Sequence, residues 1–451
     1  MDQSGFGKLG FYNLALVSIF CSIGGLFSTS INAKLGVNVS LFLGAIFDGL
    51  WILCSLLPTM RNQITDQEEL NNSVIFSKQF IYPVMLFASC VCGLTTGLLW
   101  TSQGVYISQC ATEENKGFYF GYFWTMYTLS QVFGNLIAAL VIGNTNQVTY
   151  FIVMASIALA SSLLFITLRK PTLQNQEQLS LSDLVIEANA NQKQIQTADS
   201  GIVDLQGMSQ TQNSSISNNM IQKTSEVSIY QNAMSILKFM VSPRMRYFIL
   251  EIGWTGFSIS YFSGMLVLIM TDSMGADESE SLKSYEKALF AMVALGVGEV
   301  VGSQLVGQIV DKVNSKVAVI FNLVVLVLML IVTFIYLIIY EFSWLAFVMT
   351  FLWGVQDAAV NTHCMEMLGF EFDDNSEAFA VFAMFQGIIC FFVQLVQSLV
   401  IDRTGFIIYT SVFGIIGVIS IGLTYFFDFK EKKAQDSQRV REYTLIEQKQ
   451  N

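Results

Sequence analysis

Charge, proline and histidine are scarce in this sequence. Charged residues occupy 13% of the 451 positions, and the chain has only 4 prolines and 1 histidine, whereas 53% of its residues are hydrophobic. Such a composition excludes an ordinary soluble globular protein and a disordered one. The 7 cysteines lie in apolar blocks or at their edges, so no disulfide framework is expected. The net charge of -11 argues against a nucleic-acid partner.

The hydrophobic residues gather in eleven blocks, each long enough to cross a hydrocarbon core of about 30 Å as a helix. The blocks are continuous and lack the alternation of apolar and polar residues that is typical of strands. We therefore predict an all-α integral membrane protein with the lipid bilayer as a partner. The predicted spans are residues 10–32, 37–58, 80–106, 118–142, 147–168, 247–270, 287–310, 316–339, 344–363, 376–400 and 404–427.

A polar segment divides these spans into five before and six after. Residues 169–246 are rich in Gln, Asn and Ser and predict a disordered linker. The predicted domains are therefore an N-terminal half-bundle (1–168), this linker, a C-terminal half-bundle (247–427) and a tail (428–451).

Basic residues predict the orientation in the membrane. Placing the linker and tail in the cytoplasm puts 17 Lys and Arg there and 6 outside, as the positive-inside rule favours. Residues 59–79 and 271–286 are then outside. Asn71, in the sequon Asn71-Asn72-Ser73, becomes a glycosylation candidate, in a plasma membrane or endomembrane glycoprotein.

Several motifs carry a resemblance to known transporters. Two half-bundles joined by a long linker resemble the major facilitator superfamily, in which each half has six spans. Residues 307–312, which read GQIVDK, resemble its G-x-x-x-D-[RK] signature. The resemblance implies that Gly307, Asp311 and Lys312 form a latch at the cytoplasmic end. The equivalent stretch of the first half, residues 33–36, has no Asp.

Longer stretches resemble the Unc-93-like family within that superfamily. They are residues 93–106 (GLTTGLLWTSQGVY), 130–136 (SQVFGNL), 354–362 (GVQDAAVNT) and 376–386, where Ala383 replaces an expected basic residue. Residues 7–12 resemble the entry to the family's second helix, so the first helix of the usual twelve is missing. We expect an incomplete gene model rather than a true loss.

Acidic residues inside the spans are the main candidates for function. A charge at the bilayer centre costs at least about 2.5 to 3.5 kcal/mol, yet Asp48, Glu251, Glu299 and Asp357 all lie within predicted spans that contain no Lys or Arg beyond their first residue. We predict Asp48 to be peripheral. We predict Glu251 and Asp357 to lie at similar depth and face one water-accessible cavity, either as a proton or cation site or as packing groups.

Polar and aromatic residues on the matching helices are candidates to line the same cavity. They are Trp100, Thr101, Gln103 and Tyr106 in the first half and Asn361 and Thr362 in the second. A buried Gln or Asn can equally serve as interhelical glue.

No enzyme motif is present: the sequence has no GK[ST] loop, no G-x-S-x-G and no zinc spacing. We expect no cofactor and no metal, and His363 beside Cys364 and Glu366 is interpreted as structural.

Two functions remain. One is a secondary transporter of a small solute, coupled to a proton or cation. The other is a regulator, because the Unc-93-like resemblance implies roles in potassium homeostasis or with a channel or receptor subunit. The missing latch Asp in the first half favours the regulator narrowly, although fold alone is a poor guide to function.

Overall fold

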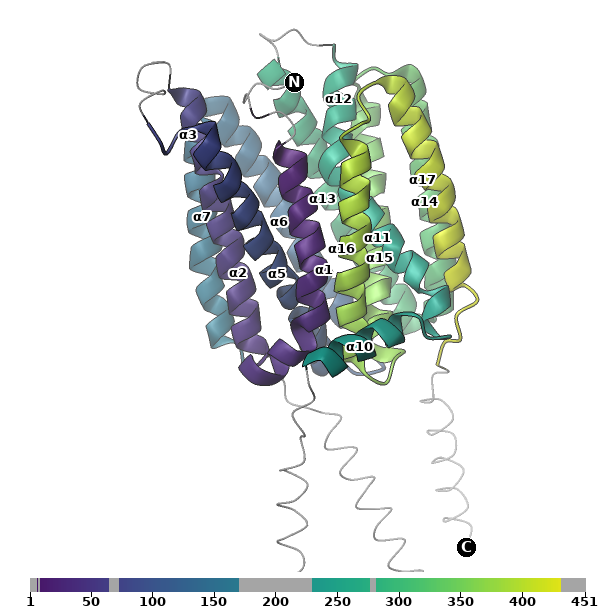
Figure 1. Cartoon of the computed structure of the whole chain (residues 1–451). Coiled ribbons are helices and arrows are strands. Elements are labelled where there is room, and N and C mark those ends of the chain that lie inside the picture. Colours follow the sequence, from purple (N-terminus) through teal and green to yellow (C-terminus); the bar gives the residue numbers. More distant parts are fainter. Residues whose placement is uncertain (1–5, 7–8, 65–72, 170–228, 276–280, 431–451) are drawn as a thin grey trace, which may run out of the picture.

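The computed structural model describes residues 6, 9–64, 73–169, 229–275 and 281–430. Within these residues the chain forms helices and connecting turns, without strands. Figure 1 shows the purple and blue helices of the first half on one side of the bundle and the teal to yellow helices of the second half on the other. Arg169, Ile229 and Lys430 lie at one end, which we call the insert end, and the sequence predicts this end to be cytoplasmic.

The first half comprises five long helical segments. They are α1 (Leu9–Leu35), α2 (Val37–Cys54) continued by α3 (Leu56–Gln63), α5 (Lys78–Cys110), α6 (Lys116–Asn144), and α7 (Gln147–Ser162) continued by η1 (Leu163–Thr167).

The second half comprises six. They are α11 (Ile249–Tyr261) continued by the π-helical segment η3 (Phe262–Leu266) and α12 (Val267–Ser273), then α13 (Ser281–Lys312), α14 (Ser315–Ile339), α15 (Trp344–Phe370), α16 (Asn375–Gln397) and α17 (Arg403–Thr424).

The all-helical membrane fold is confirmed. Every predicted span falls on one of these segments, and nine helices of the described chain are long and apolar enough to cross a membrane. Polar side chains mark several helix starts: the side-chain oxygens of Asn314, Asp374 and Asp402 accept backbone N–H groups from the first turns of α14, α16 and α17.

The linker prediction is wrong at its C-terminal end. Residues 229–240 form helix α10 (Ile229–Met240), an amphipathic helix that lies across the insert end (Figure 1). Asn232 Nδ2 donates to Ser30 Oγ of α1, and Ser235 Oγ donates to Glu377 Oε1 of α16. Contacts with both halves, rather than helix propensity alone, stabilise this short helix. Asn71 and residues 170–228 and 431–451 lie outside the described residues.

The two halves meet along two close helix pairs, α1 with α16 and α6 with α13. Glycines permit this approach. A Cβ atom on Gly307 would lie 2.5 Å from the carbonyl oxygen of Gly117, and one on Gly387 would lie 2.4 Å from Ser22 Oγ. Backbone therefore packs directly on the opposite half at both seams.

Candidate functional site

A cavity of about 170 Å³ lies between the halves. Its walls come from α1, α5 and α6 of the first half and from α11, η3, α15 and α16 of the second. The lining residues are Val17, Ser18, Cys21, Thr96, Trp100, Trp124, Tyr127, Ile259, Phe262, Asp357, Phe382, Gln386, Gly387 and Cys390. The π-helical segment contributes Phe262, and such segments often occur at functional sites.

Asp357 is the one carboxylate among the described lining residues, which include no Lys, Arg or His. Its side chain is only 2% exposed, and Oδ1 has no hydrogen-bond partner within the described part of the chain. A buried carboxyl group without a partner is costly unless it is protonated or meets a cation. The arrangement therefore suits a ligand that supplies a positive charge or a proton.

Aromatic rings form the first-half wall of the cavity. The ring centroids of Trp100 and Trp124 are 5.9 Å apart, and Tyr127 lies 5.1 Å from Trp100 and 5.3 Å from Trp124. Trp100 comes from α5, whereas Trp124 and Tyr127 lie one turn apart on α6. These three residues, here called the aromatic wall, include one predicted candidate, Trp100.

Other polar groups in the cavity are bonded within the protein. Ser18 Oγ donates to Gln394 Oε1 at 3.1 Å, and Gln386 Nε2 donates to Thr255 Oγ1 at 2.8 Å. Thr96 Oγ1 donates to Asp48 Oδ1 at 2.8 Å. Asp48 was predicted to be peripheral, but this bond places it directly behind the cavity wall.

The prediction that Glu251 and Asp357 face one cavity is wrong. Glu251 is fully buried with its Oε1 3.4 Å from His363 Nδ1, and it is not among the lining residues. Ser258, two helical turns after Glu251, donates to Gln356 beside Asp357, so the two acids differ in depth by about 10 Å. The predicted depth of Asp357 was wrong because α15 continues to Phe370, seven residues past the predicted end of its span.

Five further cavity candidates lie elsewhere. Thr101 Oγ1 donates to the backbone of its own helix at Gly97, and Tyr106 OH donates to the carbonyl oxygen of Arg169 near the insert end. Asn361 Nδ2 donates to the carbonyl oxygen of Asp357. Gln103 and Thr362 are buried outside the lining.

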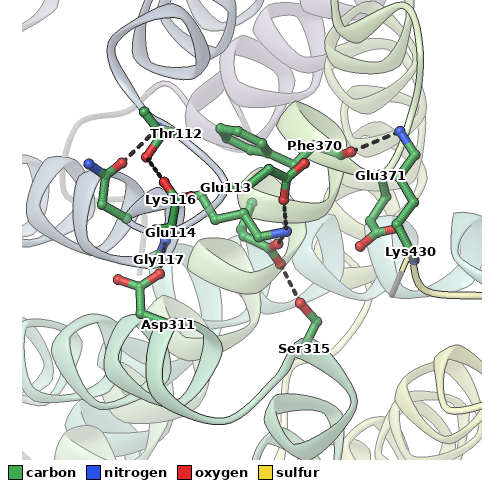
Figure 2. Close-up of polar contacts among 12 residues, drawn as sticks. Thr112, Glu113, Glu114, Lys116, Gly117, Asp311, Ser315, Phe370, Glu371 and Lys430 are labelled. Carbon is green, nitrogen blue, oxygen red and sulfur yellow. Dashed lines mark hydrogen bonds and ion pairs between the residues drawn. The ribbon is translucent and has the colours of Figure 1, made fainter. Parts of the chain in front are cut away.

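The predicted latch residues lie where the halves meet at the insert end. Asp311 Oδ1 accepts the backbone N–H of Gly117 at 2.8 Å (Figure 2). Asp311 Oδ2 accepts the backbone N–H of Phe118 at 2.7 Å. These groups begin α6, so the carboxylate of the second half caps a helix of the first and meets its positive dipole end. Lys312 contacts Gln308 on its own helix, and its share in a latch stays a prediction.

A buried ion pair that the sequence did not reveal joins the halves beside this cap. Lys116 Nζ lies 2.7 Å from Glu366 Oε1, with side chains 7% and 0% exposed. Ser315 Oγ donates to Glu366 Oε2 at 3.0 Å, and Glu113 lies 3.1 Å from the same lysine (Figure 2). The sequence contained one signal, a lysine just before an apolar block, but nothing in it specified the partner.

The chain after α17 covers the same end. The backbone N–H of Lys430 donates to Glu371 Oε2 at 2.8 Å, and Arg244 pairs with that oxygen at 3.1 Å. Burial raises the pKa of the Glu371 carboxyl above its usual value, while the Lys430 N–H opposes this rise. The predicted tail is therefore packed on the bundle at residues 428–430.

Comparisons with known proteins agree with this arrangement. The sequence matches the Major Facilitator Superfamily over residues 3–394. It is 24% identical over 415 residues to the UNC93-like protein MFSD11 of Xenopus laevis, covering 86% of this chain and 81% of that protein. It is 29% identical over 165 residues to the UNC93-like protein C922.05c of Schizosaccharomyces pombe, covering 35% and 29%.

Solved structures share the fold. The proton:xylose symporter XylE bound to 6-bromo-6-deoxy-D-glucose superposes with a TM-score of 0.65 at 15% identity, covering 94% of this chain and 86% of that one. A partially occluded inward-open form of XylE from E. coli gives a TM-score of 0.59, also at 15% identity, covering 95% and 91%.

Proposed function

The chain belongs to the major facilitator superfamily, in its Unc-93-like family, and from that premise we propose that it is a secondary transporter that moves a small solute by alternating access. Its relatives and structural neighbours point to a transporter rather than an enzyme. The observation that carries the proposal is the cavity between the halves, whose walls come from both halves and which contains one carboxylate, Asp357, whose Oδ1 has no hydrogen-bond partner among the described residues.

The insert end supports the same proposal because its contacts run between the halves. The Asp311 cap on α6 and the Lys116–Glu366 pair connect the halves there, which supports a state closed at this end. Opening the cavity at the insert end requires both contacts to break. Contacts of this kind suit a protein that alternates between two closed ends.

Asp357 is the group that we expect to bind the coupling proton, the coupling cation or the charge of the solute itself. Each would neutralise a carboxylate that has no basic partner among the described lining residues. A role in potassium homeostasis or with a channel or receptor subunit stays a prediction from the Unc-93-like resemblance.

Alternating access can be tested without knowing the solute. Cys21 lines the cavity, so a variant that keeps Cys21 and replaces the other 6 cysteines reports on access to it. We expect a membrane-impermeant maleimide to label Cys21 in right-side-out and in inside-out vesicles. Asp311→Asn should shift labelling by several-fold toward the insert end, because the amide has one acceptor oxygen where the carboxylate uses two, and it carries no charge to meet the helix dipole.

Two controls accompany this experiment. Lys312→Ala should not shift the labelling, because Lys312 contacts Gln308 on its own helix. A variant that keeps only Cys54, which packs on a cluster near the opposite end, should respond to neither substitution. Labelling of Cys21 from one side only, unchanged by Asp311→Asn, would contradict alternating access.

A further inference from the structure

The charge of the cavity restricts the solute first. Among the described lining residues the formal charge comes from Asp357 alone, and its Oδ1 lacks a hydrogen-bond donor. An anionic solute would meet a carboxylate without any lysine, arginine or histidine to offset the repulsion. A cationic solute would instead give that carboxylate its missing partner.

The aromatic wall restricts the solute further. Trp100, Trp124 and Tyr127 gather within 5.9 Å of one another between ring centroids, on the half opposite Asp357. Tyr127 lines the cavity from the middle of α6. Ring faces attract cations, and tryptophan does so most strongly. A cation between Asp357 and these rings would be attracted from both halves.

The rest of the lining argues against two other classes of solute. A bare metal cation needs six or more oxygen ligands or retained water, whereas most of the described lining residues are apolar or aromatic. A sugar needs many free donors and acceptors, and Ser18, Thr96 and Gln386 already donate their hydrogen atoms to protein partners. Apolar side chains such as Ile259 and Phe382 complete the wall and suit hydrocarbon groups.

The volume sets the size of the solute. A cavity of about 170 Å³ is close to that of cavities that accept benzene. A solute of roughly six to ten non-hydrogen atoms would fill it.

From these observations we propose that the transported solute is a small organic cation, an alkyl- or arylammonium compound. Its charged nitrogen lies between Asp357 and the aromatic wall, and its apolar groups lie against the remaining lining. This inference rests on the proposed transport function, because it names the solute class of the same cavity.

The experiment measures protection of Cys21 from maleimide in the single-cysteine protein. The probes are choline, phenethylammonium, their neutral analogues with tert-butyl or hydroxyl in place of the ammonium group, D-xylose and potassium ion, each at millimolar concentration. We expect the two ammonium probes to slow labelling. The neutral analogues, xylose and potassium should not.

Substitutions separate the two contacts. Asp357→Asn should weaken protection by at least about 30-fold, because it removes the buried charge partner while keeping the shape. Trp100→Leu should weaken it by about 10-fold while keeping an apolar side chain. Asp373→Asn, which removes an acidic charge at a fully exposed position, should leave protection unchanged.

The outcomes are distinct. Equal protection by a neutral analogue or by xylose would overturn the cation class, as would the failure of both ammonium probes to protect. In either case labelling from both sides with its Asp311 dependence would still support alternating access. If Cys21 is labelled from one side only, the transport proposal itself fails.

Discussion

The two halves of the bundle differ in how deeply their helices are buried. In the most apolar stretch of Gln147–Thr167, 11% of the residues are buried inside the protein. In the most apolar stretches of Met245–Ser273 and Asn375–Gln397, 67% and 56% of the residues are buried. All three segments are long and apolar enough to cross a membrane. Apolar composition therefore shows that a helix can lie in a membrane, but not whether lipid or protein surrounds it.

The halves also differ in chemistry. Five buried acids of the described chain belong to the second half: Glu251, Glu299, Asp357, Glu366 and Glu371. The first half contributes the aromatic wall and the one buried lysine of the described chain, Lys116. The Lys116–Glu366 ion pair and the lining of the cavity both draw on the two halves, so the site exists only where the halves meet.

The largest effect on stability is expected where a glycine in a tight helix contact is replaced by alanine, which adds one methyl group. A Cβ atom on Gly354 of α15 would lie 1.9 Å from the carbonyl oxygen of Leu295, whereas one on Gly134 of α6 would have no atom within 4 Å. Gly354→Ala should push α13 and α15 apart and cost about 3 kcal/mol or more. Gly134→Ala should be neutral or stabilise the helix by up to about 1 kcal/mol.

The measurement is the thermal midpoint of the purified protein, together with its elution profile in size-exclusion chromatography. Equal midpoints for the two alanine variants would remove the contrast between the tight contact of α13 with α15 and the open face of α6 at Gly134.

A second substitution tests the chemical difference. Lys116→Met leaves Glu366 buried without its positive partner and should destabilise the protein by about 3 to 5 kcal/mol. The double variant Lys116→Met with Glu366→Met should recover most of that loss, because replacing both members of a buried ion pair is often neutral. Glu113→Gln is the control, since Glu113 is 60% exposed and should matter little.

Thermal unfolding of the single and double variants in a double-mutant cycle gives the coupling energy. Additive losses would show that the lysine of the first half and the acid of the second half do not depend on one another.

The smallest effect is expected at the C-terminal segment. Lys430→Ala removes the contact of Nζ with the carbonyl oxygen of Phe370 but keeps the backbone N–H that Glu371 accepts. The change in stability should be within about 0.5 kcal/mol. Chemical denaturation of the Lys430→Ala and Arg244→Ala variants measures the change in the free energy of unfolding. Arg244→Ala should cost more, because it removes the ion pair with buried Glu371 and the ring contacts with Phe372 and Phe427.

The spans could be predicted from the sequence because every block of sufficient apolar length forms a helix here. The rotation of each helix about its axis and the residue at which it ends could not be predicted in the same way. Glu366 fell beyond the predicted end of its span, yet protein rather than water surrounds the last turns of α15. Asp357 and Trp100 were predicted as cavity residues from the family resemblance, whereas Trp124 and Tyr127 carried no motif and emerged only when α6 was placed beside α5.

One uninterrupted helix, α15, carries both Asp357 and Glu366, nine residues or about 13.5 Å apart along its axis. A ligand at Asp357 and the ion pair at Glu366 therefore act on the same rod. If occupancy of the cavity favours one position of that rod by some factor, fixing the rod through Lys116 changes the affinity of the cavity by the same factor. Under the proposed function, the contact at the insert end would be an effector of ligand binding and the ligand an effector of that contact, through a single reciprocal coupling free energy.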